Sequence, residues 1–266
     1  MVVLRHAPIL SRRDEGESSP FVTGVGSRQD GDMHPGLQNV ANRAAYYATL
    51  RQTLLAETLE EQVGDHQIAG HLQEGTLQFV GAERTLTARC HLIASVAPGP
   101  KSMLWGWAHP QGGGEVAGRV KELGERFGIT DLTSPELPFE AGNDIAATTA
   151  HLGHLAACVG VEATRISPYY TVNAGGGTRL VMVLEGIDVP EPSLMQVASR
   201  VEPVLTSGII TDHRSAVLGL AEHREGFSVD DQGQQIVLSD ETGSITFRLD
   251  DQQRITNASM SLHAQG

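Results

Sequence analysis

The stretch that decides the fold holds both tryptophans and reads Ser102-Met103-Leu104-Trp105-Gly106-Trp107-Ala108-His109-Pro110. Successive side chains of a β-strand point to opposite faces, so Met103, Trp105 and Trp107 would share one face. The opposite face would be nearly flat, and small residues there let another element approach closely. Large aromatic rings need an apolar surface to cover them, and Pro110 cannot donate to a sheet ladder. We therefore predict a central strand that ends at Pro110.

The residues on either side of this stretch predict further strands. Apolar and polar side chains alternate over residues 85–96, which is typical of a half-buried antiparallel strand. Pro98-Gly99-Pro100 then turns the chain into the tryptophan strand and gives a meander. Two later strands are expected at 167–172 and 178–185, joined by a glycine-rich loop at 173–177 that suits a hairpin.

Helices are expected to cover one face of this sheet. Apolar residues recur at three- and four-residue intervals over residues 39–63, 115–127 and 143–159, and a glycine follows the end of each segment. Two short strands, 67–72 and 76–80, separate the first helix from the meander. The pattern predicts an α+β fold with an antiparallel sheet covered on one face by helices.

A proline-rich stretch, Val189-Pro190-Glu191-Pro192, is the predicted boundary between two parts of the chain. We expect a main α+β domain over residues 36–189 and a smaller helix-and-antiparallel-sheet unit over residues 193–266. Apolar spacing predicts a helix over residues 194–204, and Asp212 is placed to cap another. Strands of this unit are expected at 235–239, 244–249 and 254–262.

The first residues of the chain carry no apolar periodicity. Residues 1–35 are rich in Gly, Ser, Asp, Arg and Pro, which predicts a disordered leader. Met33 immediately precedes the first patterned segment, so translation from Met33 rather than Met1 stays open as an alternative.

Composition limits the classes of partner. The chain has 266 residues and a formal net charge of -13, which repels phosphate backbones and anionic membrane surfaces, so we expect neither nucleic acid nor membrane as a partner. Its apolar runs are shorter than a bilayer requires. Cys90 and Cys158 are too few for a disulfide framework and are consistent with a reducing compartment, which predicts a cytoplasmic protein.

The tryptophan stretch and the helix after it resemble an uncharacterised bacterial family, a domain of unknown function with the pattern Trp-x-Trp-x-Trp-Ala-Asn-Pro. Met103 stands at the first Trp of that pattern and His109 at its Asn. The resemblance covers roughly residues 50–186, and its other matching residues are Trp105, Trp107, Ala108, Pro110, Leu123-Gly124-Glu125-Arg126-Phe127-Gly128 and Leu132-Thr133-Ser134-Pro135. It implies a fold but no activity, so it assigns no site residues.

The tryptophan strand suggests one candidate ligand pocket. Trp105 and Trp107 could form its floor, with His109 at the rim and Tyr169 or Tyr170 nearby, because aromatic side chains often line small-ligand sites. The alternative is that these rings are ordinary core. His109 titrates near neutral pH, or simply hydrogen-bonds the turn.

A candidate metal site lies on the predicted helix 143–159. His151, His154 and Cys158 fall close to one helix face and would present two imidazoles and a thiol. The sequence shows no fourth ligand nearby, so exposed histidines beside a buried thiol are the alternative. We expect no bound cofactor.

The sequence favours a non-enzymatic binding or interaction module, because it offers ample core and no convincing reactive constellation. The alternative is a small-ligand-binding or hydrolytic enzyme with a cleft beside the Trp105 and Trp107 strand. The partner would be a protein or a small molecule of unspecified identity. A homo-oligomer formed through the edge of the C-terminal sheet is a further hypothesis.

Overall fold

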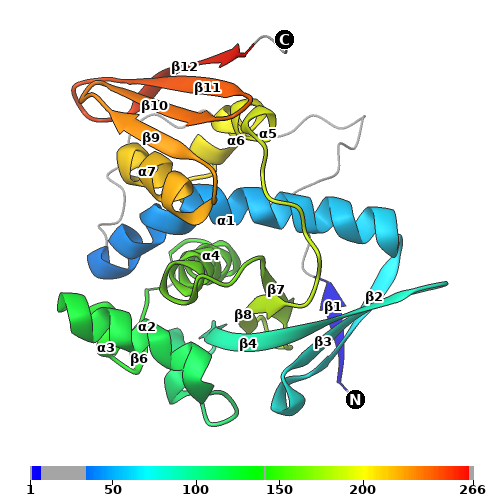
Figure 1. Cartoon of the computed structure of the whole chain (residues 1–266). Helices are drawn as coiled ribbons and strands as arrows, with labels where there is room; N and C mark the ends of the chain where they lie inside the picture. Colours follow the sequence, from blue (N-terminus) through cyan, green and yellow to red (C-terminus); the bar gives the residue numbers. More distant parts are fainter. Residues whose placement is uncertain (1, 7–33, 141, 264–266) are drawn as a thin grey trace.

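The structure, a computed structural model, describes residues 2–6, 34–140 and 142–263 (Figure 1). The helices are α1 (Pro35–Gln62), α2 (Gly114–Phe127), α3 (Thr130–Thr133), α4 (Ile145–Thr164), α5 (Leu194–Ser199), α6 (Val201–Leu205) and α7 (His213–His223), with the 3-10 turns η1 (Leu72–Glu74) and η2 (Gly106–Ala108). The strands are β1 (Val2–His6), β2 (His66–His71), β3 (Thr76–Gly81), β4 (Thr85–Ala97), β5 (Ser102–Trp105), β6 (Glu136–Pro138), β7 (Tyr169–Asn173), β8 (Arg179–Glu185), β9 (Ser228–Asp231), β10 (Gln235–Asp240), β11 (Gly243–Leu249) and β12 (Ile255–Leu262). None of the described helices combines the length and apolarity that crossing a bilayer needs.

The larger sheet is antiparallel and curls until its strands close on themselves. Its order is β3-β2-β1-β7-β8-β4-β5-β6, and β3 also pairs with β4, so the strands from β3 to β4 form a ring. The thirteen-residue β4 makes this possible, since its first half pairs with β3 and its second half with β5. The predicted α+β class with antiparallel sheets is confirmed.

The two faces of the curled sheet are buried in two apolar clusters. Alternation along the strands sends Phe79 and Tyr170 to one face, where the second half of α1 covers them with Leu55. Ile93 and Trp105 lie on the other face, packed with the first half of α1 and with α4. Helix α1 therefore contributes to both clusters, and helices cover more of the sheet than the single face predicted.

Part of the predicted disordered leader, residues 1–35, lies within the described residues. Val2–His6, inside the predicted leader, form strand β1 between β2 and β7. The rest of that leader up to Met33, including the alternative start, lies outside the described residues. Helix α1 begins at Pro35, a residue suited to a first helical position because it needs no N–H partner there.

The tryptophan stretch is shorter as a strand than predicted. Strand β5 ends at Trp105, and Gly106 begins the 3-10 turn η2, so the prediction that Trp107 continues the strand is wrong. A side chain at Gly106 would overlap the carbonyl oxygen of Leu92 on β4. The close approach of another element, predicted from the small residues, therefore occurs where the strand turns, and the element is β4.

The C-terminal residues form a second antiparallel sheet, in the order β12-β11-β10-β9. Figure 1 shows this sheet above α5, α6 and α7, with α1 between it and the larger sheet. Helix α7 packs closely on α1, and a side chain at Gly219 would overlap the carbonyl oxygen of Arg43. Buried residues of the C-terminal sheet, such as Phe247, belong to the same apolar cluster as α1 and α4.

The predicted helix over residues 194–204 is wrong as a single element. The chain forms α5 and α6, which meet at Arg200. The ring of Pro203 would clash with the carbonyl of Ser199 in a continuous helix, and proline lacks the N–H for the usual hydrogen bond. Elements α3, β6 and β9 were not predicted, because each is too short to show a period.

Candidate functional site

The two tryptophans differ in their surroundings. Trp105 is 0 % exposed, and its Nε1 donates to the carbonyl oxygen of Asp131 at 2.9 Å. Trp107 is only partly buried, and the Nζ of Lys121 lies 5.4 Å from its ring centre. The indole Nε1 of Trp107 is itself buried and has no hydrogen-bond partner among the described residues.

The other residues of the predicted pocket do not converge on the tryptophans. His109 Nδ1 accepts from the N–H of Gln111 at 3.1 Å, which orders the turn, and burial lowers the pKa of His109. Strands β8 and β4 separate β7, with both tyrosines, from β5. Tyr169 and Tyr170 also lie on opposite faces of the sheet, as alternation requires. An open hollow of about 440 Å³ lies elsewhere, lined by Asp65, His66, Gln67, Val80, Gly81 and Ala82.

The residues of the predicted metal site lie along α4 and point to different surroundings. His151 is exposed, whereas Cys158 is 2 % exposed, and burial raises the pKa of its thiol to about 12. His154 Nδ1 is 3.0 Å from the hydroxyl of Tyr169, and burial lowers the pKa of His154. Within the described residues, no three His, Cys, Asp or Glu side chains are grouped so that they could hold a metal ion.

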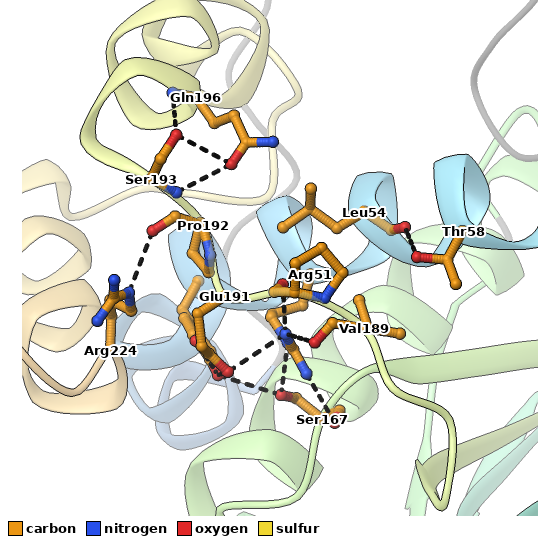
Figure 2. Close-up of polar contacts among 12 residues, drawn as sticks. Arg51, Leu54, Thr58, Ser167, Val189, Glu191, Pro192, Ser193, Gln196 and Arg224 are labelled. Atoms are coloured by element: carbon orange, nitrogen blue, oxygen red, sulfur yellow. Dashed lines mark hydrogen bonds and ion pairs between the residues drawn. The ribbon is translucent and has the colours of Figure 1, made fainter. Parts of the chain in front are cut away.

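A charged residue with many partners is Arg51 on α1, which is 6 % exposed (Figure 2). Its Nη1 donates to the carbonyl oxygens of Val189 and Pro190 at 2.8 and 2.6 Å, and forms an ion pair with Glu191 at 3.2 Å. Its Nε donates to the Oγ of Ser167 at 3.1 Å. One guanidinium therefore holds the predicted boundary segment against α1.

A chain of hydroxyl groups runs beside Arg51. The Oγ of Ser167 donates to the hydroxyl of Tyr47 at 3.3 Å, and that hydroxyl donates to Glu191 Oε2 at 3.0 Å. Burial raises the pKa of Tyr47, so its hydroxyl remains a donor at neutral pH. The chain ends on a carboxylate that Arg51 already neutralises, which favours holding the segment in place over activating a nucleophile.

A second ion group surrounds the buried Glu162 near the end of α4 and meets α1 at Arg43, about two helical turns before Arg51. Its carboxylate accepts from the Nε2 of His223 at 2.8 Å and from the Nε of Arg43 at 2.9 Å. Burial alone would raise the pKa of Glu162, but the hydrogen bonds from His223 and Arg43 outweigh it and lower that pKa to about 2. The ring of His223 stacks on Tyr47 with centroids 5.1 Å apart, which connects the two groups.

We call these connected residues the polar joint: Arg43, Tyr47, Arg51, Glu162, Ser167, Glu191 and His223. They come from α1, α4, α7 and the segments between them, so they link the C-terminal unit to the body of the protein. Their polar groups are bonded to one another, which offsets the desolvation of the buried members Arg51, Glu162 and His223. The joint can fix geometry, but it leaves little capacity to bind a ligand.

Sequence patterns did not predict the polar joint. Its one local signal is the four-residue spacing of Arg43, Tyr47 and Arg51, which places polar groups on a helix side that is otherwise buried. The partners Glu162 and His223 are too distant in sequence for a pattern to reveal.

Strand β12 lies at the outer edge of the C-terminal sheet, and among the described strands it pairs with β11 alone. The N–H of His263, just after it, donates to the carbonyl oxygen of Thr242 at 2.9 Å. Bonded and unbonded pairs alternate along an antiparallel ladder. The backbone N–H and C=O groups of Ala258, Met260 and Leu262 therefore point away from β11. We call this side of Asn257–Leu262 the open edge.

The open edge is uncharged and partly apolar. The side chains of Ala258, Met260 and Leu262 face the helices, opposite the buried inner residues of β11. Leu262 is nevertheless 56 % exposed, and Met195 on the adjoining α5 is 57 % exposed. Strands usually protect an edge with charge, and β12 carries no Asp, Glu, Lys or Arg.

A family model described as a family of unknown function (DUF6882) matches residues 38–187. The chain belongs to this family. The predicted resemblance to an uncharacterised family is thus confirmed. No curated protein matches the chain, and no solved structure matches it.

The DUF6882 match covers part of the polar joint and none of the open edge. It includes α1, α4 and most of the larger sheet, and hence Arg51 and Ser167 of the polar joint. It ends before Glu191, before His223 and before the whole C-terminal sheet. The family description therefore adds no information about the open edge, whose function has to be argued from its own geometry.

Proposed function

We propose that this protein is a non-enzymatic interaction module that binds an extended protein segment along the open edge of its C-terminal sheet. Residues 193–266 would be the binding unit, and residues 36–189 the scaffold that supports it. The observation that carries the proposal is the row of outward backbone groups at Ala258, Met260 and Leu262. A strand added there would satisfy them, as in other cases of strand addition.

The side chains around the edge support the same function. An incoming strand would place alternate side chains beside Met260 and Leu262, the latter of which is 56 % exposed. Backbone hydrogen bonds would supply affinity and these apolar contacts specificity. Methionine suits such a surface because its side chain adapts to different partners.

Compartment and partner class belong to the same proposal. The free cysteines Cys90 and Cys158 support a cytoplasmic location. The net charge of -13 supports a protein partner over nucleic acid or an anionic membrane.

One observation favours a second candidate, a small-ligand or hydrolytic enzyme with a site beside Trp105 and Trp107. The buried Nε1 of Trp107 lacks a partner among the described residues, and a polar ligand atom could accept from it. His109 would lie at the rim. The joint residues and the thiol of Cys158 offer this candidate little, because the former are bonded together and the latter stays protonated.

The test is position-specific photo-crosslinking in the native cell. A benzophenone amino acid replaces Asn257 on the open edge or, as a control, Glu122 on the exposed side of α2. We expect a covalent protein adduct from position 257 and none from position 122. Adding Ala258→Pro should abolish the adduct, because it removes one outward N–H. Equal adducts from both positions, or none from 257, would overturn the proposed function.

A further inference from the structure

We propose that the segment bound at the open edge is β12 of a second copy of this chain, paired antiparallel about a two-fold axis through Met260. This inference rests on the proposed function and names its partner. It follows from three properties of β12: the direction of the backbone groups that point away from β11, the identity of its side chains and its lack of charge.

The backbone groups fit a symmetric pair. A two-fold axis perpendicular to the sheet keeps each side chain on its own face, so directly opposed residues must be an even number of positions apart. With Met260 opposite itself, Ala258 faces Leu262 of the second copy and Leu262 faces Ala258 of the second copy. All three are the residues whose N–H and C=O groups point outward. The pair of Met260 residues, and each pair of Ala258 with Leu262 of the second copy, can therefore exchange both of their hydrogen bonds, while the pairs between them are the non-bonded pairs of an antiparallel ladder.

The side chains also match under this symmetry. On the inner face the small Ala258 lies opposite the large Leu262 of the second copy, and methionine lies opposite methionine. On the outer face Ser259 lies opposite Ser261 of the second copy, and Asn257 lies opposite His263 of the second copy. Apolar residues thus meet apolar ones and polar residues meet polar ones, which stabilises cross-strand pairs.

Charge favours this edge over the others for contact between copies. Two chains that each carry -13 repel one another, so they can approach most readily through an uncharged surface. The opposite edge of the same sheet, β9, carries Asp230 and Asp231 and would bring like charges together. The edge strand β6 of the larger sheet has three residues and ends in Pro138. Among the described strands, β12 is the edge best suited to self-pairing.

The same contact would cover the exposed apolar side chain on the inner face of β12. Leu262 is 56 % exposed although its partner on β11, Gly243, is buried. Joining two sheets brings the inner faces of both copies into one continuous apolar surface. Leu262 would then pack against Ala258 of the second copy without any rearrangement of the monomer.

The first experiment measures the mass of the purified full-length chain by light scattering and sedimentation over a wide range of concentrations. We expect a reversible monomer–dimer equilibrium. Ala258→Pro should shift it to monomer, because the proline lacks one outward N–H but breaks no bond to β11. Ala258→Val is the matched control and should still dimerise, since it keeps that N–H. Thermal unfolding of both variants checks that the monomer is folded.

The second experiment tests the symmetry directly. Met260→Cys places two thiols opposite each other across the axis, at a Cα separation near 5.5 Å that a disulfide can span. Mild oxidation should give a covalent dimer that reductant reverses. Val229→Cys on β9 is the control and should form no covalent dimer, because its thiol lies at the opposite edge of the sheet. The native Cys90 and Cys158 are buried and should not react.

The outcomes separate this inference from the proposed function. A monomer at every concentration, with no disulfide from Met260→Cys, overturns the second-copy pairing. An in-cell adduct from position 257 to a different protein would then leave the proposed function standing with another partner. A dimer that persists in Ala258→Pro and cross-links equally through Val229→Cys also overturns the second-copy pairing, because the contact would lie elsewhere. The absence of any in-cell adduct from position 257 overturns the proposed function, and this inference with it.

Discussion

The larger sheet and the C-terminal sheet of this protein end in different ways. Among the described strands, the larger sheet closes through the β3–β4 pair and keeps an edge at the short β6, which ends in Pro138. The C-terminal sheet ends at β12, an uncharged strand of eight residues that pairs with one described strand, β11. A sheet that has closed its edges can serve as a scaffold, whereas one with an open edge can accept a partner.

The largest expected effect comes from breaking the closed sheet. Val181 on β8 is fully buried and pairs with both β7 and β4. Val181→Pro removes a donor in the middle of the sheet, where proline is not tolerated, and should lower the free energy of unfolding by at least about 3 kcal/mol. Chemical denaturation measures this loss. Val181→Ala, which keeps the N–H, separates the packing cost, and equal losses in the two variants would contradict the prediction.

The elements of this closed sheet could largely be predicted from sequence, but its closure could not. The alternation in residues 85–96 and the hairpin around Gly175 are local patterns, and they predicted β4, β7 and β8 to within a few residues. Pairing of β1 with β7 joins residues separated by most of the larger domain. No spacing rule connects such residues.

The candidate sites show the same limit. Strand alternation alone was enough to place Tyr169 and Tyr170 on opposite faces, and applying it would have removed one of them from the predicted pocket. The polar joint depends on Glu162, Arg43 and His223 meeting from three helices. Their contact follows from tertiary packing, which single-sequence patterns do not contain.

The second prediction concerns the contact between α7 and α1, whose loss should destabilise the C-terminal sheet more than the larger sheet. Gly219→Ala places a methyl group against the backbone carbonyl of Arg43, which cannot rotate away as a side chain could. We expect a loss of about 3 kcal/mol and faster amide exchange in α7 and the C-terminal sheet than in β4 and β8. Gly118→Ala on α2 is the control, because its Cβ would meet open space and should raise helix stability slightly. Uniform loss of protection in both sheets would contradict this.

The third prediction concerns the polar joint that links the two sheets. Glu162→Gln leaves the buried His223 without its carboxylate partner, whereas the partly exposed Arg43 keeps its ion pair with Glu222, and the change should cost about 2 kcal/mol at neutral pH. The matched control is Glu122→Gln, an exposed residue on α2, whose effect should be within about 0.5 kcal/mol. Denaturant midpoints give both values, and equal effects would show that the joint contributes little.

The fourth prediction concerns how the stability that Glu162 contributes to the polar joint depends on pH. The pKa of Glu162 is about 2 in the folded protein, below its ordinary value of 4.5, so folding favours the ionised carboxylate. That stability is fully present above the unfolded pKa and is lost as the pH falls from about 5 toward 2, because the unfolded chain binds the proton first. The difference between wild type and Glu162→Gln should therefore shrink over this range. A difference that stays constant from pH 6 to pH 3 would contradict the lowered pKa.

The smallest expected effect on stability comes from proline substitutions at two adjacent positions of the open edge. The N–H of Ser259 points toward β11, whereas that of Ala258 points away, so the same substitution at adjacent positions should have different consequences. Ser259→Pro removes a ladder bond and should cost about 1 to 3 kcal/mol, but Ala258→Pro should cost less than about 1 kcal/mol. The measurement is denaturation at concentrations where the chain is monomeric, so that loss of pairing between copies does not contribute. If the two variants were equally destabilised, β12 would not present alternate backbone groups to solvent. The closed and open sheets would then no longer differ in the property on which the proposed binding depends.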